Sequence, residues 1–102
     1  MTQRRVNETS LTQGVDEQIT YTVTTTPWGS TPTAVAVKAY DMLTDYLDVT
    51  ATVLTGSASV IGDVITLPVL KSLTKDHIYR LEVKFTCAGN VFECYAEITG
   101  ER

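Results

Sequence analysis

The sequence predicts an all-β protein, a sandwich of about seven antiparallel strands in two sheets. Short segments with alternating apolar and polar residues recur along the chain, and turn-forming residues separate them. Thr and Val are abundant, and both favour half-buried strands. At 102 residues the chain is long enough for one modest hydrophobic core. We therefore expect residues 1–102 to form a single domain with almost no helix.

The N-terminal third begins with a polar segment, residues 1–10, that we expect to fray, with residues 6–11 as a short edge strand. Residues 12–16 read as a turn. Residues 18–25 alternate regularly and predict the first strong strand. A loop follows at residues 26–33, because its prolines and glycine are unsuited to a central strand.

The middle of the chain continues with a strand at residues 34–40. Residues 41–48 fit either one helical turn or a loop. Their apolar side chains are expected to cover one end of the sandwich: Met42, Leu43, Tyr46 and Leu47. A short strand is expected at residues 49–54. Residues 59–67 predict a hairpin with a two-residue turn at Gly62 and Asp63.

Residues 76–99 contain the strongest pattern, two alternating runs around one turn, which predicts a long antiparallel hairpin. The side chains expected in the core are Tyr79, Leu81, Val83, Phe85, Phe92, Cys94, Ala96 and Ile98. Gly89 and Asn90 tolerate positive φ and are the expected turn residues. Residues 100–102 are expected to be a tail.

The two cysteines, Cys87 and Cys94, lie on this hairpin. With a turn at Gly89 and Asn90 they become diagonal neighbours, with Cβ atoms roughly 7 Å apart. That separation exceeds the ~3.8 Å of a disulfide. We therefore expect two reduced thiols that pack as small apolar side chains. A hairpin-closing disulfide in a secreted domain is the alternative.

Catalytic and cofactor motifs are absent, so the sequence predicts neither an enzyme nor a cofactor. His77, the single histidine, is expected to be a surface loop residue without an organised partner. Asp41, Asp45 and Asp48 form an acidic group, and Asp63 is a candidate to join it in space. Their spacing is not that of a calcium loop, so we expect no metal.

The net charge of −4 and the lack of a basic cluster argue against nucleic acid as a partner. No apolar run is long enough to span a bilayer, so no membrane segment is expected. Residues 1–10 lack the apolar core of a secretory signal. We expect a cytoplasmic protein that begins at Met1, and a cleaved leader with secretion is the alternative.

Trp28, in the loop at residues 26–33, has two readings. Its ring either folds back over the end of the sandwich or serves as an exposed anchor for a partner protein. Tyr40 and Tyr46 are candidates to extend such a contact surface, together with Tyr21 and Tyr95.

Tyr79 follows Asp76 by three residues, just inside a late strand. This placement resembles the tyrosine corner of immunoglobulin-like sandwiches, in which the phenol bonds to backbone upstream. The position two residues on is Leu81, where antibody domains have a cysteine. The expected fold is therefore an immunoglobulin-like sandwich without the antibody disulfide.

Residues 33–102 resemble the small immunoglobulin-like domains of structural gene clusters in tailed phages and prophages, including fibre-tail adaptor proteins. Three stretches carry the resemblance: residues 34–37 leading to residues 46–49, the hairpin at residues 59–67, and residues 79–83 with residues 92–94. Residues 71–75 stand where that family often has paired glycines.

The resemblance implies a non-enzymatic virion or tail-associated protein, located in the cytoplasm of a bacterial host or in the virion. Its expected partners are other virion or tail proteins, and a homo-oligomer is a further possibility. The alternative function is a secreted adhesion or carbohydrate-binding β-sandwich domain.

Overall fold

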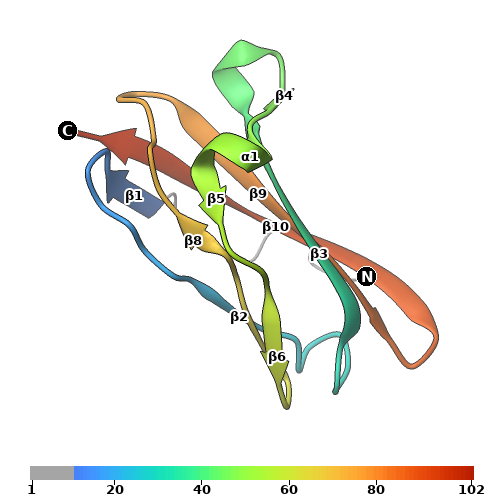
Figure 1. Ribbon diagram of the computed structural model, residues 1–102. Helices are drawn as coiled ribbons and strands as arrows, with labels where there is room; N and C mark the ends of the chain where they lie inside the picture. The colour runs from blue at the N-terminus through green and yellow to red at the C-terminus, as the bar shows by residue number, and fades with distance from the viewer. Residues whose placement is uncertain (1–10) are drawn as a thin grey trace.

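The computed structural model describes residues 11–102 and shows an all-β fold whose sheets pack around one core, consistent with the expected β-sandwich (Figure 1). Strands from different sheets contribute side chains to the same buried cluster, which includes Val23, Ile65 and Phe85. Helix is limited to one turn of 3₁₀-helix and one short α-helix within the described residues.

The larger sheet has five strands in the order β1-β10-β9-β3-β4. Its strands are β1 (Leu11–Gly14), β3 (Thr33–Asp41), β4 (Leu47–Asp48), β9 (Ile78–Cys87) and β10 (Asn90–Glu101). The strands β9 and β10 form the long hairpin that the alternation predicts, and β3 pairs antiparallel with the other edge of β9. The expected strand at residues 34–40 is therefore confirmed.

The second layer consists of two short sheets, one in the order β2-β7-β6 and one that pairs β5 with β8. Its strands are β2 (Thr22–Thr24), β5 (Leu54–Thr55), β6 (Ser59–Ile61), β7 (Val64–Thr66) and β8 (Val69–Leu70). A single bridge between Ile19 and Leu70 connects the chain before β2 to β8. The hairpin β6–β7 turns at Gly62, whose φ is 59°, as expected from its sequence.

Every expected core position of β9 is buried, because alternate side chains of a strand lie on one face of the sheet. Tyr79, Leu81, Val83 and Phe85 are each at most 2% exposed. On β10, Cys94 and Ile98 are equally buried, while Phe92 and Ala96 are half-buried against the same cluster.

The turn of the long hairpin differs from the prediction by two residues in register. Cys87 pairs with Asn90, so Ala88 and Gly89 form the turn, with φ of 49° and 81°. Cys94 then faces Val83, and the two cysteines lie well apart along the hairpin instead of diagonally. Both are buried thiols and no disulfide joins them, as expected. The reason is their separation along the hairpin and not a diagonal placement.

Residues 49–54, the expected short strand, are mostly a helix, α1 (Thr50–Val53), with only Leu54 continuing into β5. The β propensity of its Thr and Val residues is overridden by tertiary contacts. Val53 is buried in the core, and the hydroxyl of Thr50 accepts a hydrogen bond from the amide of Ala39 on β3.

The turn expected at residues 12–16 begins only after β1, which runs parallel to β10 and so departs from the all-antiparallel expectation. The buried side-chain amide of Gln13 also fastens this strand to the second layer, because it donates to the carbonyl oxygens of Glu17 and Leu70. Its oxygen accepts from the hydroxyl of Tyr21. The expected fraying of residues 1–10 lies outside the described residues, as does most of the strand expected at residues 6–11.

The C-terminal residues continue β10 to Glu101 and are not a tail. Gly100 is buried, and a Cβ built on it would lie 2.3 Å from the carbonyl oxygen of Thr74. The backbone of Gly100 also bonds to Asp76 and His77, so β10 fastens the loop that precedes β9.

Candidate functional site

The candidate site is the projecting loop, which we define as residues 42–48, at the end of β3 (Figure 1). It consists of the 3₁₀ turn η1 (Met42–Thr44), residues 45 and 46, and β4. The turn confirms one of the two expected conformations for this segment. Asp45 and Tyr46 both have left-handed backbones, with φ of 49° and 56°. Residues other than glycine rarely adopt this conformation.

Three large apolar side chains of the projecting loop are exposed. Leu43 is 58% exposed, and Tyr46 and Leu47 are each 53% exposed. The expectation that they cover the end of the sandwich is wrong. The left-handed pair turns the chain sharply back, so the loop leaves the end of the sheet and does not fold over the core.

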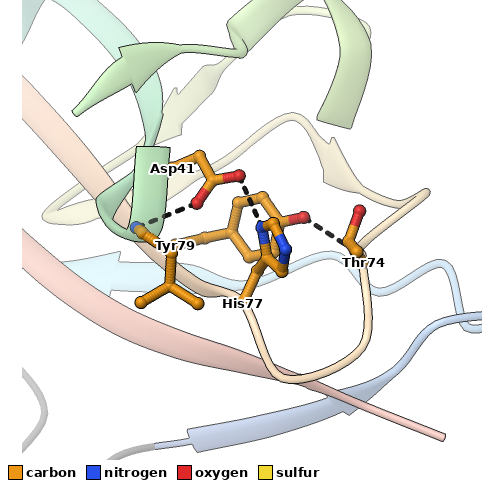
Figure 2. A network of polar contacts seen from close by, with 5 residues as sticks. Asp41, Thr74, His77 and Tyr79 are labelled. Carbon is orange, nitrogen blue, oxygen red and sulfur yellow. Dashed lines mark hydrogen bonds and ion pairs between the residues drawn. The ribbon is translucent and has the colours of Figure 1, made fainter. Parts of the chain in front are cut away.

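The base of the loop is held by Asp41, the last residue of β3, whose side chain is largely buried (Figure 2). One carboxylate oxygen accepts from the amide of Leu43 at 3.1 Å and caps η1. The other lies 2.7 Å from Nδ1 of His77. An ionised carboxylate only accepts, so Nδ1 of the histidine is the donor. Asp41 thus joins the projecting loop to the loop before β9.

His77 therefore has an organised partner, which contradicts the expectation of an isolated loop histidine. Its ring also stacks on Tyr79, with centroids 6.5 Å apart. The sequence reasoning missed this pair because Asp41 and His77 are 36 positions apart, and only the pairing of β3 with β9 brings them together.

Tyr79 is the second anchor in this region, because its phenol bonds to the backbone upstream of it. Its hydroxyl accepts a hydrogen bond from the backbone amide of Thr74 at 2.7 Å, as Figure 2 shows. The side chain is 2% exposed. The bond fixes the loop that carries His77 against β9.

The acidic group of the projecting loop is not joined by Asp63. That residue lies in the β6–β7 turn, where its carboxylate accepts from Thr26 and from the amide of Thr31. Thr31 precedes β3 and Asp41 ends it. Asp63 and Asp41 are therefore separated by about 27 Å, the length of a nine-residue strand. Residues 11–102 contain no group of three or more metal-ligating side chains placed to hold a metal ion.

The aromatic contact candidates do not form one surface. Trp28 is half-buried and packs edge-on against Phe85, with centroids 5.9 Å apart, so its ring belongs more to the core than to the surface. Tyr40 is half-buried on β3 between Arg80 and Asp48. Of the three candidates, only Tyr46 lies on the projecting loop.

The electrostatics of the loop are acidic. Asp45 and Asp48 are exposed, and residues 42–48 contain no Lys or Arg. Hydrogen bonds from the side chain and backbone of Thr50 lower the pKa of Asp48 from its ordinary value of 3.8. Asp48 therefore remains charged at neutral pH beside the apolar side chains.

None of the described helices is long and apolar enough to cross a membrane. Comparison of the chain with protein-family models, with curated proteins and with solved structures finds no match.

Proposed function

We propose that this chain is an immunoglobulin-like interaction module without enzymatic activity, and that it acts as a structural or tail-associated protein of a phage or prophage. In immunoglobulin-like sandwiches, strands C, F and G share one sheet, and strands B, E and D belong to the other. If β3, β9 and β10 are matched in chain order to strands C, F and G, their neighbouring places in the larger sheet support the proposal. The order β2-β7-β6 in the second layer supports it in the same way when these strands are matched to B, E and D.

The bond from Thr74 to the hydroxyl of Tyr79 further supports the immunoglobulin-like assignment. One departure is β1, which pairs with β10 and not with β2. A second is the absence of a disulfide between the sheets, since both cysteines lie on the same hairpin. These departures fit a disulfide-free relative of the fold.

The observation that carries the interaction role is the projecting loop. Large apolar side chains in water gain free energy when a partner covers them, and contiguous exposed apolar patches mark interaction sites. Leu43, Tyr46 and Leu47 lie within five residues of one another. The left-handed backbone and the Asp41 cap hold them in one conformation, which lowers the entropy cost of binding.

Mass spectrometry of tailed particles tests the proposal. Particles are purified after prophage induction from the organism that carries the gene, with the wild-type chain or with L43S/Y46S/L47S. We expect peptides of the wild-type chain in a fixed ratio to capsid or tail proteins. If one or two of the three replaced side chains each contribute about 2 kcal/mol to binding, the amount of the variant in the particles should fall about tenfold or more.

The matched control is Ile61→Ser, which removes an apolar side chain that is 81% exposed on the β6–β7 hairpin, away from the projecting loop. Its occupancy should equal that of the wild type. Particles that assemble without the wild-type chain would contradict the virion role. Equal losses for both variants would contradict the role of the loop.

A further inference from the structure

The charges around the projecting loop indicate the chemistry of its partner. Asp45 and Asp48 are exposed beside Tyr46 and Leu47, whereas Asp41 is buried and engaged by His77. Residues 42–48 therefore present an apolar group with two carboxylates at its border and contain no Lys or Arg. The cation nearest in effect is Lys38 on β3, whose charge also lowers the pKa of Asp48. This arrangement matches the usual division of an interface into an apolar centre and a polar rim.

We propose that the projecting loop docks into an apolar groove of a different protein, and that Lys or Arg side chains form the rim of that groove. This inference rests on the proposed function. Leu43, Tyr46 and Leu47 enter the groove, and Asp45 and Asp48 face the cationic rim. Rim charges of this kind accelerate association and select the partner more than they raise affinity.

A second copy of this chain is a poorer occupant. The other cluster of exposed apolar side chains among the described residues is at the β6–β7 hairpin: Val60, Ile61 and Val64. The charged residue there is Asp63, and residues 59–66 contain no Lys or Arg. A head-to-tail contact between the two apolar clusters would bring carboxylates toward a carboxylate. An anionic membrane surface is disfavoured by the same charges.

The geometry of the loop suits a rim contact. Asp45 is the C-cap residue of η1 and has a left-handed backbone, and its exposed carboxylate remains available to a partner. Asp48 accepts from the amide of Thr50 at 3.0 Å, which fixes its carboxylate at the end of β4. Substitution by Asn keeps an acceptor oxygen at both positions and removes only the charge.

Salt washing of purified particles tests the inference. Wild-type particles are washed at ionic strengths from about 0.05 M to about 1 M, and the retained chain is measured by quantitative mass spectrometry. The Debye length falls from about 14 Å to 3 Å over this range, so we expect about a tenfold loss of the wild-type chain. The variant D45N/D48N should be about tenfold less abundant at low salt and should respond little to further salt.

The matched control is D16N/E101Q, which removes the same net charge from two exposed residues outside the loop. It should follow the wild type within about twofold. Carbodiimide cross-linking, which joins carboxylates to lysines in contact, identifies the occupant in the same particles. Cross-links from Asp45 or Asp48 to another protein support the inference.

Several outcomes overturn the inference. Retention that salt does not change, with D45N/D48N equal to the control, excludes a cationic rim and leaves the proposed function intact. Cross-links that join only copies of this chain identify a second copy as the occupant. Binding of the purified chain to vesicles of phosphatidylcholine and phosphatidylglycerol assigns the loop to a lipid surface. Absence of the wild-type chain from particles at every ionic strength overturns the proposed function as well.

Discussion

Replacing Tyr79 by Phe removes one oxygen atom and leaves the ring in place, so it isolates the contribution of a single hydrogen bond. The ring is 2% exposed, and its hydroxyl accepts from the amide of Thr74 at 2.7 Å. A hydrogen bond of this kind contributes about 0.5–1.5 kcal/mol, and a part-buried amide without a partner adds a further cost. We therefore expect the free energy of unfolding to fall by about 1–2 kcal/mol.

Urea unfolding followed by tryptophan fluorescence measures this change. For a two-state domain, the midpoint should fall while the dependence of the free energy on urea concentration stays constant. The thermal midpoint should fall by roughly 5–15 °C, since about 1 kcal/mol corresponds to 4–8 °C at this size. Hydrogen exchange of the Thr74 amide should accelerate, because the amide loses its acceptor.

The control is Tyr40→Phe, which removes the same atom from a half-buried ring on β3. No hydrogen bond to the hydroxyl of Tyr40 occurs among the described residues, so we expect a change within about 0.5 kcal/mol. The reasoning is refuted if the two variants have equal stability, or if exchange at Thr74 is unchanged in the Tyr79 variant.

Three further predictions concern other parts of the chain. Gly100→Ala should destabilise by more than about 2 kcal/mol in urea unfolding, because its Cβ would lie 2.3 Å from the carbonyl oxygen of Thr74; wild-type stability would contradict this. Both cysteines should resist a thiol reagent in the folded protein and react in urea without reductant, and fewer than two reactive thiols would indicate a disulfide. Thr50 lowers the pKa of Asp48 below 3.8, so the charge of Asp48 stabilises the fold above that pH and the contribution disappears as pH falls through the lowered value. The stability difference between wild type and D48N should therefore shrink on acidification toward pH 3, and a difference that grows would refute this assignment.

The long hairpin could be predicted because its signal is local. Alternation in residues 78–99 assigns each side chain to one face of a strand, and burial follows the assignment on β9 without exception. The turn was predicted one residue too far along the chain, which shifts the strand pairing by two residues. Ala88 adopts positive φ although Gly89 and Asn90 favour this conformation more. Local preference alone does not decide between adjacent two-residue turns.

The candidate site was only partly predictable. The sequence identified residues 41–48 as a turn or loop and Tyr46 as a contact candidate, but it placed the apolar side chains against the core. Their exposure depends on the left-handed pair at Asp45 and Tyr46 and on the cap from Asp41. Trp28 was left with two interpretations by the sequence, and its edge-on contact with Phe85 supports the one in which the ring packs against the core.

By itself the sequence determined the all-β class, the hairpins β6–β7 and β9–β10, and the faces of the longest strands, because these follow from side-chain periodicity and turn chemistry. The tertiary structure alone decided that residues 50–53 are helical, that β1 lies parallel to β10, and that Asp41 meets His77. Those features depend on contacts between residues far apart in the chain. Burial of Val53 outweighs strand propensity, and the buried side-chain amide of Gln13 requires its partners. The carboxylate of Asp41 has a local donor in the amide of Leu43, but its second partner, His77, is supplied only by the folded sheet.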